Sequence, residues 1–270
     1  MIKEHKKTGT LYRKWAAESP KAALLLVHGL GTHSDSWKFT GDFFLKRNIS
    51  SYAVELRGFG ETKGLKGHID SFDTYYKDIK TLREVITEEN GNIKVFLAGQ
   101  SMGGVIVFTA SALYPRIFDG IICVAPAFTT KIKFSAIERA DIFASFFYNG
   151  KKNFNLPFSA EMCTRDPHHR KTMDSDHREI RFATSNLLVS IFLAGLRGRI
   201  LKNRIKPPVL FLLAGEDALV SSGACRKVFK GLKVRDKTLI EYPGMYHALN
   251  VELGREKVFE DIFKWIKHRS

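Results

Sequence analysis

A glycine-flanked serine at the end of an apolar run constrains this 270-residue chain more than any other feature of its sequence. Residues 95–98 are uniformly apolar, as in a buried parallel strand, and residues 105–113 can form a helix. Ser101 stands in the turn between them. Strand and helix can approach closely across such a strained turn only if the residues two before and two after the serine lack side chains. Gly99 and Gly103 meet this requirement, so the sequence predicts a sharp strand–serine–helix turn.

Apolar strands and helical stretches alternate along most of the chain, which is typical of a mostly parallel sheet flanked by helices. With 44% hydrophobic residues, the chain can bury a substantial core. The predicted strands are residues 11–15, 24–27, 52–56, 95–98, 120–124, 209–213 and 238–241. The predicted helices of this core are residues 37–47, 72–87, 105–113 and 252–268. We therefore predict the α/β class.

The alternation stops after Pro126. From residue 127 to about residue 205, helical pieces rich in phenylalanine take its place, among them residues 137–148 and 178–196. Pro207 and Pro208 mark the return to alternation. We therefore divide the chain into a first core part (1–126), an inserted helical cap (127–205) and a second core part (206–270).

The formal net charge of +15 is unusual for an enzyme that acts on small neutral molecules. Nucleic acid, an anionic membrane surface and anionic substrates would each suit such a charge. Nucleic acid is the least favoured partner, because no aromatic RNP strand or zinc finger accompanies the basic residues. A basic surface that is simply solvated is the plainest alternative.

The composition also indicates a compartment. Residues 1–7 are polar and basic, and no apolar run approaches the roughly 20 residues needed to span a bilayer, so we expect neither a secretory signal nor a membrane anchor. Cys123, Cys163 and Cys225 are odd in number and lie outside any metal-ligand pattern. We therefore expect a cytoplasmic protein with free thiols and with no metal or organic cofactor.

Four motifs resemble, in order and spacing, those of the monoacylglycerol lipase and lysophospholipase group of α/β-hydrolases. They are His28-Gly-Leu-Gly31, Leu56-Arg-Gly-Phe-Gly60, Gly67-His-Ile-Asp-Ser-Phe72 and Gly99-Gln-Ser-Met-Gly-Gly104. The last contains the G-x-S-x-G signature of that superfamily. The group usually has aspartate where this chain has Glu55, which we interpret as a conservative structural change. The resemblance implies an α/β-hydrolase fold with a cap inserted over the active site.

The resemblance and the loop positions together assign three catalytic residues. Ser101 would be the nucleophile, and the loop after the strand at residues 209–213 would supply Asp217 as the acid, with Glu216 as its rival and Asp236 as a distant one. His247 is the histidine that follows the last predicted strand. The chain order serine, acid, histidine is the order of the α/β-hydrolase template.

Two backbone N–H groups are expected to form the oxyanion hole. They belong to Leu30, in the glycine-rich loop after the strand at residues 24–27, and to Met102, which follows the nucleophile. We expect His28 and His33 only to shape the first of these loops.

The resemblance and the phenylalanine-rich cap favour an acyl lipid as substrate. We expect substrate contacts from Gly29, Phe128, Phe143, Phe146, Phe147 and Phe192. The predicted function is a serine hydrolase that cleaves a monoacylglycerol or lysophospholipid ester, with an anionic membrane surface as a further partner. A short-chain carboxylesterase, a thioesterase or C–C hydrolase with the same triad, and a non-catalytic binding scaffold are the alternatives.

Overall fold

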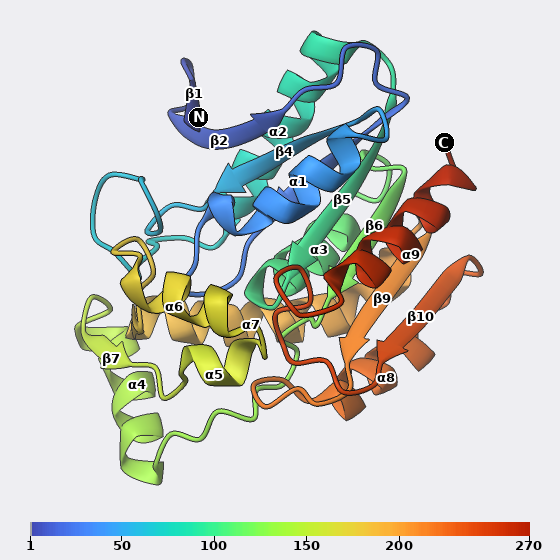
Figure 1. Ribbon diagram of the computed structural model, residues 1–270. Helices are drawn as coiled ribbons and strands as arrows, with labels where there is room; N and C mark the ends of the chain where they lie inside the picture. Colours follow the sequence, from blue (N-terminus) through green and yellow to red (C-terminus); the bar gives the residue numbers. More distant parts are fainter. Residues whose placement is uncertain (1) are drawn as a thin grey trace.

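An eight-stranded sheet forms the centre of the computed structural model, which describes residues 2–270 (Figure 1). In chain order the strands of this sheet are β1 (Ile2–His5), β2 (Thr10–Trp15), β3 (Ala22–Val27), β4 (Ile49–Glu55), β5 (Lys94–Gln100), β6 (Gly120–Val124), β9 (Val209–Ala214) and β10 (Lys237–Tyr242). Across the sheet they lie in the order β1-β2-β4-β3-β5-β6-β9-β10. The run from β4 to β10 is parallel, whereas β1 and β2 are antiparallel additions at one edge.

Helices cover both faces of this sheet (Figure 1). They are α1 (Lys38–Leu45), which follows the short helix η1 (Ser34–Trp37), α2 (Asp73–Asn90), α3 (Met102–Leu113), α8 (Ser222–Lys230) and α9 (Arg255–Lys267). On one face, α1 and α9 bury Phe44, Phe259 and Trp265 against the strands. On the other face, α2 and α3 bury Ile79 and Ile106 in the larger core. A sheet buried on both sides explains why its central strands are continuously apolar.

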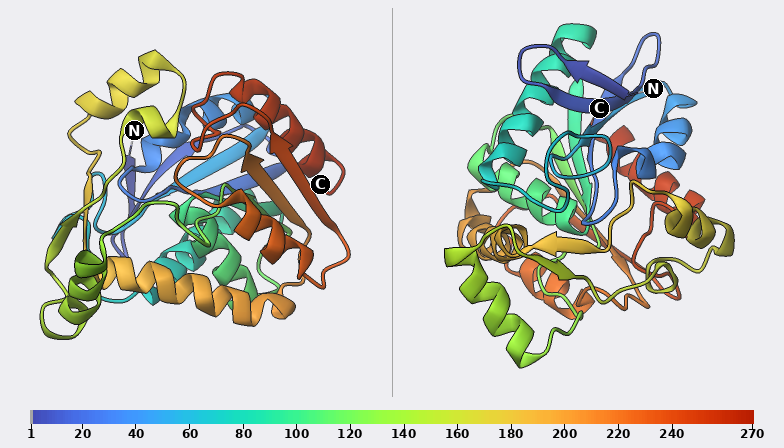
Figure 2. Two further views of the ribbon diagram at one scale, coloured as in Figure 1. Left: turned by 90° about the horizontal axis from the view of Figure 1, so that it is seen from below. Right: turned by 90° about the vertical axis from the view of Figure 1, so that its left-hand side faces the viewer.

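Residues 127–205, which we call the insert, connect β6 to β9. Its elements are α4 (Ala136–Tyr148), β7 (Asn153–Asn155), α5 (Ala160–Cys163), α6 (Pro167–Ser175), β8 (Phe182–Thr184), α7 (Ser185–Leu201) and η2 (Lys202–Arg204). Strands β7 and β8 form a separate antiparallel pair. The insert lies beyond the carboxyl ends of the parallel strands, and Figure 2 shows α7 as a long helix beside the core.

The predicted alternation of strands and helices in the core is confirmed, with differences at several ends. Strand β1, helix α8 and the pair β7–β8 have no counterpart in the sequence predictions. Helix α7 begins at Ser185 and not at residue 178, because residues 182–184 pair with β7 as a strand. Helix α9 begins at Arg255, three positions after the predicted start at residue 252.

The parallel strands end level with one another, which decides where the loops after them meet. Val27 of β3 lies beside Gly99 of β5, and Gly99 lies beside Cys123 of β6. Val124 in turn lies beside Leu212 of β9. The loops after β3, β5, β9 and β10 therefore emerge at one edge of the sheet, where open α/β folds bind ligands.

Ser101 occupies the turn between β5 and α3. Its backbone has φ 56° and ψ −118°, a conformation that residues with a side chain rarely adopt. Two hydrogen bonds hold it there: its N–H donates to the carbonyl of Val124 (2.9 Å), and its own carbonyl accepts from the N–H of Ala127 (3.0 Å). The neighbouring strand and the start of the insert thus stabilise a strained position.

The two glycines that flank Ser101 allow the close approach that the turn requires. A Cβ atom on Gly99 would stand 2.3 Å from the carbonyl oxygen of Gly103. A Cβ atom on Gly103 would stand 2.2 Å from the carbonyl oxygen of Val27. Both obstacles are backbone atoms, so neither can turn aside as a flexible side chain could.

Gly103→Ala is therefore expected to destabilise the protein. Because α3 or β3 must shift to admit the methyl group, the free energy of unfolding should fall by about 1–3 kcal/mol. Urea titrations measure this change. Gly223→Ala is the matched control, since a Cβ atom there meets nothing nearer than Ser221 Oγ at 3.8 Å within helix α8. The control should be neutral or stabilising by up to about 1 kcal/mol. Equal losses in both variants would contradict the packing argument.

Candidate active site

The structure brings Asp217 and His247 into direct contact. Nδ1 of His247 lies 2.8 Å from Oδ2 of Asp217, and both side chains are buried. The other carboxylate oxygen, Oδ1, accepts the N–H groups of Leu219 (2.9 Å) and Val220 (2.8 Å). An ionised carboxylate at this site makes Nδ1 the protonated nitrogen of a neutral imidazole and leaves Nε2 free to accept a proton.

The pKa of the Asp217 carboxyl lies below its ordinary value. Burial alone would raise this pKa, but the neighbouring His247 and the two backbone N–H groups favour the ionised form more strongly. The carboxylate can therefore orient the imidazole and stabilise a positive charge on it.

The two rival acids do not reach His247. Glu216 is exposed, and its backbone N–H donates to the carbonyl of Met245 (3.0 Å). Asp236 pairs with Arg269 at 2.5 Å. Of the three candidate acids, Asp217 is the one that contacts the histidine.

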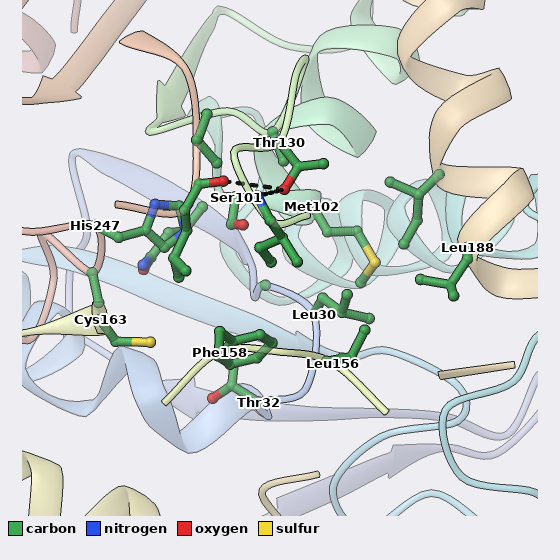
Figure 3. A pocket seen from close by; sticks show the side chains of 18 of the residues that line it. Leu30, Thr32, Ser101, Met102, Thr130, Leu156, Phe158, Cys163, Leu188 and His247 are labelled. Carbon is green, nitrogen blue, oxygen red and sulfur yellow. Dashed lines mark hydrogen bonds between the residues drawn. The ribbon is translucent and has the colours of Figure 1, made fainter. Parts of the chain in front are cut away.

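Ser101 and His247 line the same cavity, and Figure 3 shows both among its side chains. Within residues 2–270 the serine hydroxyl makes no hydrogen bond to the imidazole. Hydrogen bonds between catalytic groups are often long before a substrate is bound and tighten in the complex. The cavity therefore holds a hydroxyl, and an imidazole oriented by a carboxylate, at the carboxyl ends of β5, β9 and β10.

Leu30 and Met102 border the same cavity beside Ser101. Met102 is the first residue of α3, where a helix leaves its N–H groups without partners in the helix. In the described part of the chain, the backbone N–H groups of these two residues donate to no other backbone group. The chain packs tightly here, since a Cβ atom on Gly29 would stand 3.3 Å from the Ser101 Cβ.

His28 and Glu55 fix the loop that carries Leu30. His28 is buried; its Nδ1 donates to the carbonyl of Gly29 (2.8 Å), and its Nε2 accepts the N–H of Leu56 (3.1 Å). Burial lowers the pKa of His28 to about 4, so the ring is neutral at pH 7. The Glu55 carboxylate accepts the N–H of Ser34 (2.7 Å) and of Glu61 (2.7 Å). Glu55 thus has the structural role that the sequence indicated.

The cavity has a volume of about 550 Å³ and is mostly apolar. Four of the predicted substrate contacts line it, and they are Gly29, Phe128, Phe143 and Phe192. Phe146 and Phe147 do not. They lie further along α4 than Arg139, Ile142 and Phe143, which do line the cavity, and Phe147 is 73% exposed.

Other residues that the site predictions did not name also line the cavity. Among the apolar ones are Leu156, Ile132, Ile191, Leu188 and Val189, together with Phe134 and Phe158 from the phenylalanine-rich insert. Polar and basic residues complete the lining: Thr32, Arg139, His169, Glu179, Arg181 and Arg199. Residues 2–270 contain no cluster of three or more His, Cys, Asp or Glu side chains arranged to hold a metal ion.

Comparisons with known proteins show which family the chain belongs to. The serine aminopeptidase S33 family profile matches residues 18–254. The chain belongs to this family, within the α/β-hydrolase superfamily. It is 23% identical to a monoacylglycerol lipase of Mycolicibacterium smegmatis, over 95% of this chain and 92% of the relative.

Two further relatives of this α/β-hydrolase lead to the same group. Phospholipase YtpA of Bacillus subtilis is 27% identical over 91% of this chain and 95% of its own length. The crystal structure of the Paleococcus ferrophilus monoacylglycerol lipase superposes with a TM-score of 0.88 at 26% identity, over 97% of this chain and 99% of that one. Membership of this family confirms the predicted resemblance to the monoacylglycerol lipase group of α/β-hydrolases and indicates that the protein is a hydrolase.

Glu179 is an acid on the cavity wall of this hydrolase that the catalytic assignment does not use. It accepts a hydrogen bond from Thr32 Oγ1 (2.8 Å) and lies 3.7 Å from Arg181. Burial raises the pKa of its carboxyl from an ordinary value near 4.5 to about 7. The cavity wall therefore carries a group that changes charge near neutral pH.

The raised pKa of Glu179 predicts how stability depends on pH. Between about pH 4.5 and pH 7 the folded protein keeps a proton that the unfolded chain has released, so this group lowers the free energy of unfolding as pH rises through that window. Glu179→Gln cannot titrate. It should remain more stable than the wild type by up to about 3 kcal/mol at pH 8, with little difference at pH 4.

Urea titrations at several pH values measure this difference. Glu161→Gln is the control, because Glu161 is exposed in the same insert. A difference between wild type and Glu179→Gln that does not change from pH 4 to pH 8 would rule out the titration.

Proposed function

We propose that this protein is a serine hydrolase that cleaves the carboxylic ester of an acyl lipid, a monoacylglycerol or a lysophospholipid. The observation that carries the proposal is the 2.8 Å contact between Asp217 and His247 beside Ser101 in a large, mostly apolar cavity. The names of the relatives, monoacylglycerol lipase and phospholipase, support an acyl lipid as the substrate class.

The chemistry follows from the roles of these groups. Nε2 of His247 takes the proton of Ser101 as its oxygen attacks the ester carbonyl, and Asp217 holds the imidazole in the required tautomer. The N–H groups of Leu30 and Met102 would bind the oxyanion. The imidazolium then protonates the departing alcohol, which leaves an acyl-enzyme. Water, deprotonated by the same imidazole, releases the fatty acid and restores the serine.

The shape of the insert supports a long acyl chain over a short one. Residues 127–205 supply most of the apolar lining, and we propose that they act as a cap that covers the chain. Each buried CH₂ group contributes roughly 0.8 kcal/mol, so affinity should grow with acyl length until the cavity is full. A short-chain carboxylesterase would gain nothing from this volume.

An ester panel tests the function directly. For monoacylglycerols from acetyl to palmitoyl, kcat/KM should rise with each pair of carbons until the cavity is full. In the same assay Asp217→Asn should lower kcat by about 10⁴ through the wrong imidazole tautomer. Glu216→Gln is the matched control and should stay close to wild type, because its side chain points to solvent.

Different outcomes favour different alternatives. A preference for acetyl or butyryl esters would favour the carboxylesterase, and faster turnover of thioesters or of C–C substrates would favour those reactions. Inactivity toward the whole panel would favour the binding scaffold. A larger loss in Glu216→Gln than in Asp217→Asn would refute the assignment of the acid.

We also propose that the rim of the cavity meets a membrane surface. Helices α4 and α7 pack together and expose large apolar side chains, which are Ile137, Phe143, Phe147, Phe192, Leu193 and Ile200. Phe143 and Phe192 are 60% and 70% exposed and also line the cavity, so the apolar surface continues into it. Within residues 2–270 no helix is long and apolar enough to cross a bilayer, so the contact would be peripheral.

Basic side chains near this rim would add attraction to anionic lipids. Arg197 and Arg204 are exposed on α7 and η2. Arg199 is different, because its guanidinium donates to the carbonyl of Phe128 and to Thr129 Oγ1 (2.8 Å). It therefore holds the start of the insert and does not act as a free surface charge.

Phe147→Ser/Ile200→Ser should weaken binding to vesicles of phosphatidylcholine and phosphatidylglycerol at least tenfold, because two exposed apolar side chains no longer enter the interface. Co-sedimentation at increasing salt measures it, and the remaining binding should fall as salt screens the basic residues. Leu65→Ser is the control, since Leu65 is 45% exposed on a loop of the core. An equal loss of vesicle binding in Leu65→Ser, or a wild type that does not sediment with vesicles, would refute the membrane proposal.

A further inference from the structure

A short segment of the insert, residues 176–181, lies against the loop that carries Leu30. The N–H of Ile180 donates to the carbonyl of Gly31 (2.8 Å). Gly31 has φ 84°, and a Cβ atom there would stand 2.5 Å from the carbonyl oxygen of Ile180. The two backbones therefore touch directly, one residue beyond Leu30.

Side chains reinforce this contact on the next two residues of the loop. Thr32 donates its hydroxyl to Glu179 at 2.8 Å. Nδ1 of His33 accepts the N–H of Asp35, so Nε2 carries the ring proton and donates to Asp176 at 3.2 Å. Burial lowers the pKa of His33, so the ring stays neutral and keeps this tautomer at pH 7. Gly31, Thr32 and His33 each bond to the segment.

Arg178 is the central residue of this arrangement. Its guanidinium lies 2.7 Å from Asp176, 3.3 Å from Asp35 and 3.3 Å from Glu61. These carboxylates come from three separate stretches: the insert, the short helix η1 after β3 and the loop after β4. The arginine side chain is 20% exposed, so solvent screens the group only in part.

The charges explain why the arginine matters. Without it, three carboxylates would face one another. Among residues 2–270, the other arginine or lysine that pairs with them is Arg13, which lies 2.7 Å from Glu61 and 3.6 Å from Asp35. Like charges so close repel, and the loop after β3 would move away from the insert.

We propose that Arg178 is a positioning residue: it holds the turn from Gly29 to His33 against the insert so that the N–H of Leu30 faces Ser101. The effect on catalysis rests on the proposed function, whereas the effect on the position of the loop rests on the contacts of Arg178 alone. If the N–H of Leu30 is displaced, the transition state is stabilised less, which lowers kcat. The apolar cavity that binds the acyl chain stays intact, so KM changes little.

Arg178→Ala tests both parts. Hydrogen exchange of peptides that span residues 28–37 should be at least tenfold faster than in the wild type. With the best ester, kcat should fall by about 10- to 100-fold while KM changes by less than about twofold. Arg178→Lys keeps one positive charge but cannot reach three carboxylates with a planar fork, so it should fall between the wild type and Arg178→Ala in both measurements.

Lys152→Gln is the matched control, because it removes an ion pair with Asp141 elsewhere in the same insert. It should leave both measurements close to wild type. If Arg178→Ala failed to fold, Arg178→Lys would carry the test.

The outcomes separate the two claims. Unchanged exchange at residues 28–37 would overturn the positioning of the loop, whatever the activity. Faster exchange with unchanged kcat would overturn the role of Arg178 in the reaction, and a rise in KM alone would make it a substrate-binding residue. A wild type that hydrolyses no ester would refute the proposed function, and the exchange rates would still decide whether Arg178 holds the loop.

Discussion

The close approach of helix α3 to the ends of β3 and β5 is the constraint on which the site depends. It is possible because two glycines let backbone meet backbone, and it forces Ser101 into a conformation that a free chain would avoid. The level ends of the parallel strands then bring the loops of Leu30, Asp217 and His247 to the same edge. This strained turn places Ser101 on the wall of the cavity.

The insert is joined to each of these loops and does more than cover them. Near its start, the carbonyl of Thr129 accepts the N–H of Ser221 (2.9 Å), in the loop that carries Asp217. In its middle, the carbonyl of Cys163 accepts the N–H of Ala248 (2.8 Å), in the loop that carries His247. Residues 176–181 hold the loop after β3.

The elements that local patterns mark could be predicted from the sequence. Ser101 lies between two glycines, and His247 follows the last predicted strand. Asp217 was predicted as the acid in preference to Glu216, and in the structure its carboxylate contacts His247 and accepts the N–H of Val220. The strand–turn–helix order around Ser101 was equally visible, since its apolar runs are continuous.

Contacts between distant residues could not be predicted in this way. Thr32 and Glu179 are 147 positions apart, and Arg178 and Asp35 are 143 apart, so no period or motif connects them. The same limit explains the errors in the insert. Helix α4 carries phenylalanines both where it borders the cavity and beyond it, so the sequence does not distinguish Phe143, which lines the cavity, from Phe146 and Phe147, which do not.

In the proposed reaction, the strained serine is the nucleophile that the oriented imidazole activates. Peptide mapping by mass spectrometry after reaction with an alkyl fluorophosphonate is the sharpest test, because the probe forms a stable bond to an activated serine. We expect one adduct per chain, on Ser101, and a rate of adduct formation that falls steeply in His247→Ala although that variant keeps its fold. An unlabelled protein, or an adduct on another residue, would contradict it.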